Sequence, residues 1–231
     1  MVDNFDTKVV CHDVKSLQRV PCNFGTRVVV RNLFYNYPTR RRALQQTLSD
    51  EYIRILDVVQ GYALHFHRHS FSVIRRGKLE FRCNGYSVEE AVRAVYGTQL
   101  KNNCLSIGEI DEKKIEKRVE CHVRGCISSA SYNYSGRKRL QYVFFVNNRL
   151  VQWRNLRQTV DLAYSKYLGR HTAPWAYVAV DVDPGEVDVN VHPSKQDVLL
   201  LQEQVVLDTI LQLLTGALDA THTSRTFVDR G

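Results

Sequence analysis

Short apolar runs rich in β-branched residues recur through the second half of this chain, and they limit the folds it can adopt. The runs lie at 105–110, 119–127, 140–146, 175–182 and 187–191. In the last run Val187, Val189 and Val191 alternate with polar residues, a period of two that is typical of a strand with one buried face. Pro193 interrupts this pattern before apolar residues resume at Val198. We therefore predict a series of short strands.

Helix patterns separate these strands. Ser87 and Glu90 form a capping box ahead of a predicted helix at 88–96, and Gly97 is expected to end it. A second helix is indicated by an apolar face made of Leu156, Val160, Ala163 and Tyr167, and a third spans about Gln202 to Leu214. Three strands, a helix, two strands and a helix predict an α/β (α+β) domain with one sheet face covered.

The first 84 residues carry fewer signals. They predict a strand at 27–30, a short helix capped by Thr39, and a helix opened by Ser49-Asp50-Glu51. Ile55, Val59 and Tyr62 are expected to share the apolar face of that helix. Residues 69–83 predict a hairpin turning at Arg76-Gly77-Lys78. Because this part has no complete core pattern, we expect it to be a portion of a domain that begins upstream of Met1.

The composition favours a nucleic acid or another polyanion as partner. The formal net charge is +8 and the isoelectric point is about 9.2. The 6 cysteines include no C-x-x-C pair, so we expect reduced thiols in a cytosolic or nuclear protein. No apolar run reaches the roughly 18 residues that span a bilayer, and the N-terminus lacks the apolar core of a signal peptide. Neither membrane insertion nor export is expected.

The sequence lacks the motifs of several well-known nucleotide-binding and hydrolytic sites. There is no Walker A loop, no dinucleotide-binding G-x-G-x-x-G after a strand, no H-E-x-x-H and no G-x-S-x-G. His65, His67 and His69 alternate as a metal site on a strand would, but no other ligand stands at suitable spacing. We therefore predict an exposed polar face there and no metal site. The run Arg40–Arg42 fits either a phosphate-binding patch or a solvated helix start.

Basic residues are spread over the second half of the chain, with Tyr132 and Tyr134 near their densest part. They could contact DNA phosphates without reading sequence, or they could form an ordinary basic surface. The candidate DNA-binding residues are Arg137, Lys138, Arg139, Arg154 and Arg157.

Three stretches together resemble one family. GTRVVVRNLFYNYPTRRRAL, QYVFFVNNRLVQ and VDVNVHPSKQDV stand in the order seen in MutL-type DNA mismatch repair ATPases, and SDEYIRILDVVQGYALH resembles the eukaryotic MutL homologue 1 branch. The resemblance covers roughly residues 22–220. It implies an incomplete C-terminal portion of a GHKL/Hsp90-like ATP-binding domain at 1–84. A transducer domain resembling ribosomal protein S5 domain 2 would follow at 85–220, and a tail at 221–231.

The resemblance also implies an ATP site. Gly25 and Thr26 match the last nucleotide-binding motif, and Lys195 matches the lysine that the transducer domain extends to the γ-phosphate. The intact family proteins use ATP and Mg²⁺. Their catalytic glutamate, magnesium-binding asparagine and Asp-x-Gly-x-Gly motif have no counterpart in this sequence. We therefore expect neither ATP nor Mg²⁺ to bind well to this chain alone, and we expect it to be inactive alone.

The partners implied by the resemblance are a related MutL-type subunit in a heterodimer, MutS-type mismatch-recognition proteins and DNA, in the nucleus. The metal-dependent nuclease motif of some MutL subunits is absent. The alternative hypothesis is a stand-alone nucleic-acid-binding α/β module that does not use ATP. A third, a type II topoisomerase subunit, is disfavoured by the LFYN and NVHP stretches.

Overall fold

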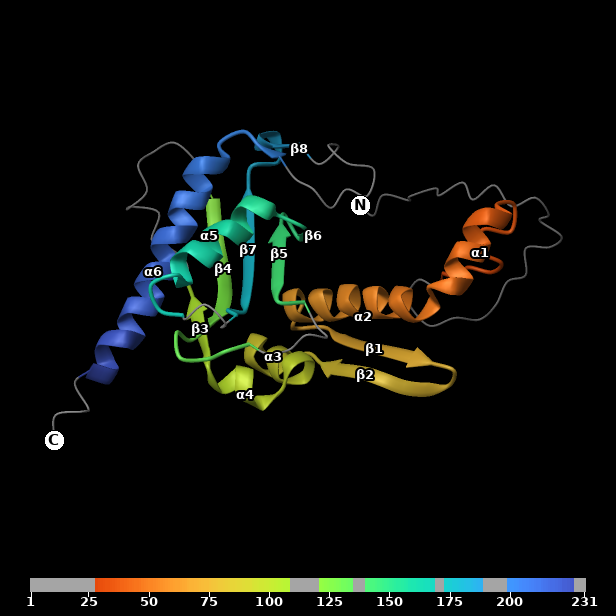
Figure 1. Ribbon diagram of the computed structural model, residues 1–231, viewed down its shortest axis with the longest axis horizontal. Helices are drawn as coiled ribbons and strands as arrows, with labels where there is room; N and C mark the ends of the chain where they lie inside the picture. The colour runs from red at the N-terminus through yellow and green to blue at the C-terminus, as the bar shows by residue number, and fades with distance from the viewer. Residues whose placement is uncertain (1–27, 109–120, 135–139, 169–172, 189–198, 227–231) are drawn as a thin grey trace, which may run out of the picture. The chain divides into compact units, whose positions relative to one another are not determined.

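The structure, a computed structural model, describes residues 28–108, 121–134, 140–168, 173–188 and 199–226. Figure 1 shows its helices and strands along the chain. The chain divides into two compact units, residues 1–47 and 48–231. The predicted division near residue 84 concerns family domains and stays a prediction.

The first unit contributes one described helix, α1 (Pro38–Gln46), none of whose residues is buried. Pro38 occupies its first turn, where a missing N–H costs nothing, so the predicted cap at Thr39 is wrong and Tyr37 precedes the helix instead. The strand predicted at 27–30 is also wrong for its described residues, because 28–30 are exposed and pair with no described strand. The Arg40 guanidinium lies 5.3 Å from the ring centroid of Tyr37.

The second unit is built on a five-stranded sheet in the order β3-β4-β7-β5-β6. Its strands are β3 (Cys104–Ile107), β4 (Cys121–Ser128), β5 (Tyr142–Val146), β6 (Arg149–Val151) and β7 (Ala176–Val182). All neighbouring pairs are antiparallel except β5 and β7, which are parallel. A parallel pair needs a long crossover, and α5 (Arg154–Tyr164) lies within the crossover between these two strands. The described parts of the strands predicted for this sheet are thereby confirmed, and so is this helix, except that it ends at Tyr164 and leaves Tyr167 of its predicted face in the turn that follows.

One face of the sheet, which we call the aliphatic face, is covered by α5 and α6 (Glu203–Thr226). Alternate residues of β7, namely Val178, Val180 and Val182, point to this side, as the period of two predicts. They pack with Leu156 and Val160 of α5 and with leucines and isoleucines of α6. Three aromatic residues, Phe144, Trp153 and Tyr164, complete this core.

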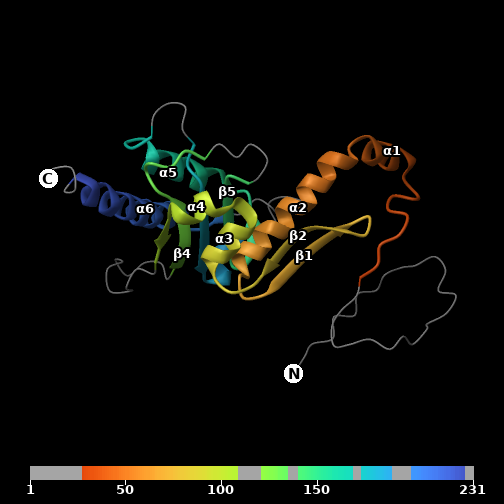
Figure 2. The same ribbon diagram turned by 90° about the horizontal axis from the view of Figure 1, so that it is seen from below.

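The opposite face, which we call the aromatic face, is covered by three helices and a hairpin. These elements are α2 (Leu48–His65), α3 (Val88–Tyr96), α4 (Thr98–Asn102), β1 (Ser70–Arg75) and β2 (Lys78–Asn84). The sheet contributes Cys126, Phe145 and Tyr177 to this side, and Trp175 lies beside them. Figure 2 shows the hairpin lying alongside α2. The prediction that only one face is covered is therefore wrong, because α2, the β1–β2 hairpin, α3 and α4 cover the other.

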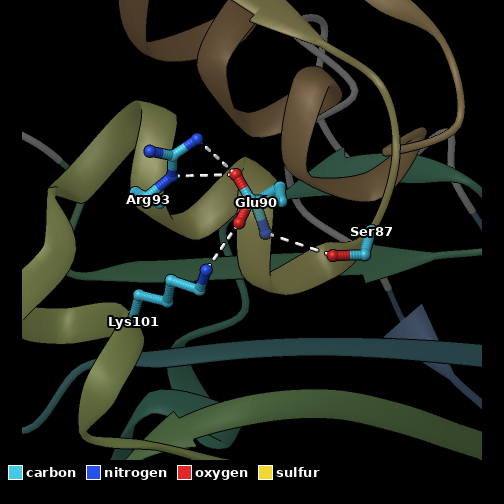
Figure 3. Close-up of polar contacts among 4 residues, drawn as sticks. All are labelled: Ser87, Glu90, Arg93 and Lys101. Carbon is cyan, nitrogen blue, oxygen red and sulfur yellow. Dashed lines mark hydrogen bonds and ion pairs between the residues drawn. The ribbon is translucent and has the colours of Figure 1, made fainter.

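The hairpin and α3 form where the sequence predicts them. Arg76 and Gly77 make the turn with φ of 50° and 77°, both in the left-handed region that two-residue hairpin turns need. At the start of α3, Ser87 Oγ accepts from the Glu90 amide at 3.2 Å, which confirms the Ser87 half of the predicted capping box, whereas the Glu90 carboxylate bonds to Arg93 and Lys101 instead. Figure 3 shows that the Glu90 carboxylate contacts both Arg93 and Lys101. Gly97 ends the helix with φ of 95°.

Two helices differ from their predictions. In α2, Val59 and Tyr62 face the core as predicted, but Ile55 is 56% exposed. His65, the last residue of α2, is buried, so the prediction of an exposed histidine strand is wrong. The α6 helix continues to Thr226 instead of ending near Leu214, because Gly216 is tolerated inside it.

Two absences can be stated for the described part of the chain. No helix there combines the length and the apolar character needed to cross a bilayer. Within the same residues, no three His, Cys, Asp or Glu side chains come together as a metal site would require. The described cysteines, Cys83, Cys104, Cys121 and Cys126, are free thiols.

Candidate nucleotide-sensing loop and basic surface

The segment with Lys195 begins and ends at a short two-stranded ladder. Strand β8 (Val187–Asp188) pairs antiparallel with β9 (Leu199–Leu200), with Val187 opposite Leu200. The Leu201 amide adds a hydrogen bond to the Glu186 carbonyl at 3.0 Å. The described residues that flank 189–198, Asp188 and Leu199, are therefore paired side by side. Lys195 itself lies outside the described residues, as do Gly25 and Thr26.

The base of this loop is held by several contacts. Asp183 caps the 3-10 helix η2 (Pro184–Glu186) by accepting from the Gly185 amide at 2.7 Å, and this short helix links β7 to β8. Leu200 is buried in the aliphatic core, and α6 begins three residues later at Glu203. The Glu203 carboxylate accepts from Trp153 Nε1 at 2.6 Å, which ties the start of α6 to the residue before α5. The two ends of the loop thus start from fixed positions.

The turn between β5 and β6 holds the end of β7. Asn147 and Asn148 form this two-residue turn with φ of 45° and 64°, and asparagine adopts such angles more readily than most residues. The Asn147 amide donates to the Val180 carbonyl at 3.0 Å. Its side-chain Oδ1 accepts from the Val182 amide at 2.9 Å. Two hydrogen bonds therefore fix the last residues of β7, from which the loop base departs.

A buried histidine contacts the same turn. His65 Nε2 lies 2.8 Å from Asn148 Oδ1, and His65 Nδ1 lies 3.0 Å from the Tyr177 hydroxyl. The ring stacks on Phe145 with centroids 3.9 Å apart and planes 6° from parallel. Because an amide oxygen can only accept, this assignment gives Nε2 the proton and leaves Nδ1 to accept from Tyr177. Figure 1 shows the elements that supply these residues, α2, β5 and β7, meeting at one end of the sheet.

The electrostatics of this site favour the neutral imidazole. Burial lowers the pKa of His65, the Asn148 hydrogen bond opposes that shift, and the nearby Arg124 guanidinium lowers the pKa further. The Asp181 carboxylate and His67 also face His65 and act in opposite directions on its pKa. Burial raises the pKa of Tyr177 to about 12, so its hydroxyl keeps its proton and can donate.

Sequence reasoning missed His65. Its one signal is position, since it stands three residues after Tyr62 and so continues the predicted core face of α2. The alternation with His67 and His69 pointed instead to a strand. The Nδ1 atom of His67 is buried without a hydrogen-bond partner among the described residues.

Only part of the predicted basic surface is described. Arg154 and Arg157 are exposed on α5, three residues apart, a spacing that makes side chains neighbours on a helix surface. The Arg157 guanidinium lies 5.1 Å from the ring centroid of Tyr142, whose hydroxyl donates to Asp161. Arg124 forms an ion pair with Asp181 across β4 and β7. Arg137, Lys138 and Arg139 lie outside the described residues.

The comparisons with known sequences agree on one family. Residues 92–219 match the family described as "DNA mismatch repair protein, C-terminal domain". The chain is 35% identical over 208 residues to "DNA mismatch repair protein MLH1" of Saccharomyces cerevisiae, covering 88% of this chain and 26% of the yeast protein. It is 28% identical over 217 residues to "DNA mismatch repair protein MutL" of Thermoanaerobacter sp. (strain X514), covering 93% of this chain and 34% of that protein. The chain thus spans roughly a quarter to a third of these relatives.

Solved structures show the same fold. The chain matches the "N terminal domain of a DNA repair protein" with a TM-score of 0.67 at 22% identity, over 82% of this chain and 60% of that one. It matches the ATPase domain of the mismatch repair endonuclease MutL of Aquifex aeolicus with a TM-score of 0.50 at 18% identity, over 81% and 59% of the two chains. The predicted α/β fold class is confirmed. Together with the sequence matches, this assigns the chain to the MutL/MLH1 family of DNA mismatch repair proteins.

Proposed function

We propose that this chain supplies the transducer part of an ATP-driven mismatch repair clamp, with Lys195 contacting the γ-phosphate of ATP and Gly25 and Thr26 lining the nucleotide site. The observation that carries the proposal is the ladder of β8 and β9, which pairs the described residues on either side of the segment containing Lys195. A lysine suits the role because its ammonium is a compact charge on a long stem. A fixed base limits where that stem can begin.

The chain's own contribution to hydrolysis is to bind and orient the phosphate. The Lys195 ammonium offsets negative charge on the γ-phosphate oxygens and donates charge-assisted hydrogen bonds to them. No described group of side chains is arranged to hold Mg²⁺. In this proposal Mg²⁺ binds together with ATP, and the roles given to this chain are those of its own residues.

The test of Lys195 uses a chimera in which this chain replaces the matching part of the yeast relative. Lys195→Ala is expected to lower kcat for ATP hydrolysis by about tenfold or more, because one charged donor to the transferring phosphate is lost. The matched control is Lys166→Ala, since Lys166 is an exposed lysine after α5. Unchanged turnover in Lys195→Ala would remove the role proposed for Lys195.

The second part of the proposal is DNA contact by the basic surface. Arg154 and Arg157, with Arg137, Lys138 and Arg139, are proposed to neutralise DNA phosphates without reading bases. Support comes from the net charge of +8 and from the exposure of the two arginines on α5.

The DNA proposal can be tested on the 231-residue chain. Arg154→Ala and Arg157→Ala should each weaken duplex DNA binding equally across sequences and reduce the salt slope by about 1. The matched control is Arg54→Ala on α2, which removes an exposed arginine that pairs with Glu51. If all three variants bind like the wild type, the arginines of α5 do not contact DNA.

DNA binding alone would also fit the alternative hypothesis of a nucleic-acid-binding module that does not use ATP. The two hypotheses differ in the chimera, since the alternative expects no effect of Lys195→Ala on turnover. A heterodimer with a related subunit, association with MutS-type proteins and a nuclear location are further parts of the leading proposal. They rest on the family relationship and not on described contacts.

A further inference from the structure

The turn between β5 and β6 connects two regions through adjacent side chains. Asn147 holds the end of β7 by its amide and its side-chain oxygen, as described above. Asn148 contacts His65 at the end of α2, at 2.8 Å. The turn therefore bridges α2 and the segment that leads into the base of the Lys195 loop.

Packing alone does not account for a histidine at this position. His65 is 6% exposed and stacks in parallel on Phe145, a contact that a phenylalanine could also make. Burying an imidazole costs free energy unless its nitrogens are hydrogen-bonded. Here both nitrogens have partners, one in the turn and one on β7. The histidine adds directional bonds that fix the end of α2 relative to the turn.

A continuous series of contacts leads from this histidine to the loop base. It passes from Asn148 to Asn147 within the turn, and from Asn147 Oδ1 to the Val182 amide. Val182 is the last residue of β7, and Asp183 follows it as the cap of η2. Strand β8 begins directly after η2, and the Leu201 amide closes the loop base onto Glu186. Each link is a covalent bond or a hydrogen bond of ordinary length.

We propose that His65 and Asn148 are positioning residues, whose hydrogen bond, acting through Asn147 on Val182, sets where the base of the Lys195 loop stands relative to α2. The functional meaning rests on the proposed function, in which α2 belongs to the ATP-binding part and the loop carries the γ-phosphate sensor. A change at the end of α2 is then passed to Lys195 through the turn. Neither residue contacts the nucleotide.

The test measures amide hydrogen exchange in the 231-residue chain. Asn148→Gly removes the acceptor and tolerates the φ of 64° at this position, so the turn itself is kept. Exchange at the Val182 and Leu201 amides is expected to speed up by about tenfold. His65→Phe keeps the ring stack and should give the same result, and the double variant should exchange no faster than either single variant.

Two control variants separate positioning from general loss of stability. Asn148→Asp restores an acceptor oxygen and should bring both amides back to near wild-type rates. Asn32→Gly changes another asparagine with positive φ, 51°, which belongs to the other compact unit of the chain, and should leave both rates unchanged. Unchanged rates in Asn148→Gly would overturn the proposal. Equal acceleration at amides throughout the sheet would overturn it as well, because that outcome indicates global destabilisation.

The hydrogen-exchange and ATP-turnover experiments together distinguish failure of the positioning role from failure of the proposed function. If Asn148→Gly loosens the loop base but Lys195→Ala leaves ATP turnover of the chimera unchanged, the positioning contact stands and the role of Lys195 fails. If Lys195→Ala slows turnover but the loop base is unaffected by Asn148→Gly, the γ-phosphate contact stands and the positioning role fails.

Discussion

The two faces of the central sheet are both buried, but they differ in the side chains that fill them. The aliphatic face packs mainly valine and isoleucine of the sheet against aliphatic residues of α5 and α6, and it also contains Phe144, Trp153 and Tyr164. The aromatic face contains Tyr177, Trp175, Phe145 and Cys126, with His65 of α2 hydrogen-bonded among them. Alternate residues of the same strand, such as Tyr177 and Val178, thus enter different environments.

Because they are buried differently, the two faces are expected to contribute differently to the stability of the fold and to the positions of its elements. Hydrocarbon burial is non-directional, and its free energy depends mainly on the area removed from water. Hydrogen bonds between buried rings and amides require particular angles, so they favour one arrangement of the elements that carry them. We therefore expect the aliphatic face to supply most of the stability, while the aromatic face fixes α2 against the β5–β6 turn.

The largest expected effect is a cavity on the aliphatic face. Leu156→Ala should lower the free energy of unfolding by about 2–5 kcal/mol, because Leu156 is fully buried on α5 and its loss leaves a cavity. Leu162→Ala on the same helix is the matched control, since Leu162 is 60% exposed, and it should change stability by no more than about 0.5 kcal/mol. Urea denaturation of both variants measures the difference, and equal losses would contradict the assignment of faces.

The second largest loss of stability is expected from overpacking inside the sheet. A Cβ at Gly125 of β4 would lie 2.1 Å from the Tyr177 carbonyl oxygen and 3.0 Å from Ile107 Cδ1. Gly125→Ala should therefore cost about 1–3 kcal/mol, because strand backbone must shift. Gly216→Ala on α6 is the control, since nothing lies within 4 Å of that Cβ. It should stabilise α6 by about 0.5–1 kcal/mol through helix propensity. Thermal denaturation of both variants measures these changes. If Gly125→Ala leaves stability unchanged, β4 and β7 can move apart at low cost in free energy.

Local sequence patterns predicted the helices and strands themselves better than they predicted which of these elements pack together. The hairpin, the Ser87 cap and the strands of the central sheet depend on neighbouring residues, and their described parts are recovered close to the predicted bounds. The second covered face depends on α2 packing against strands about 80 to 110 residues later, which no local period encodes. The burial of His65 belongs to the same long-range packing.

The candidate site was predicted by resemblance more than by physical pattern. The strand pattern before Lys195 predicts a strand, and β8 and β9 bear out pairing at the edges of that segment. Nothing in the residues alone marks Lys195 as a phosphate ligand, and its role stays a proposal. The contacts of Asn147 and Asn148 depend on the ends of α2 and β7 meeting, so the sequence NNR predicted only a turn.

The aromatic face should also make stability depend on pH. The folded pKa of His65 is lowered by burial, so the unfolded chain binds a proton there more readily than the folded chain. Stability from this group is complete above the ordinary pKa of 6.5 and declines as the pH falls from there towards the folded pKa. Between pH 7.5 and 5.5 the wild type should lose at most about 1.4 kcal/mol more than His65→Phe.

Urea denaturation at the two pH values measures this difference. Leu162→Ala is the control, since it removes an exposed side chain that does not titrate. It should keep the wild-type pH dependence. If His65→Phe keeps it too, the directional bonds of the aromatic face are not sensitive to protonation of His65, and the contrast between the faces weakens.

The smallest effect is expected at the start of α3, which covers the aromatic face from outside. Ser87→Ala removes the oxygen that accepts from the Glu90 amide and should cost about 1 kcal/mol. Ser87→Asp keeps an acceptor at the cap and should stay near the wild type. Glu90→Gln should cost less than Ser87→Ala, because the ion pairs of Glu90 with Arg93 and Lys101 (Figure 3) are partly open to solvent, where ion pairs contribute little. Urea denaturation of the three variants gives their order, and a loss in Ser87→Ala as large as that of Leu156→Ala would mean that α3 holds the aromatic face together as strongly as the hydrocarbon core holds the other.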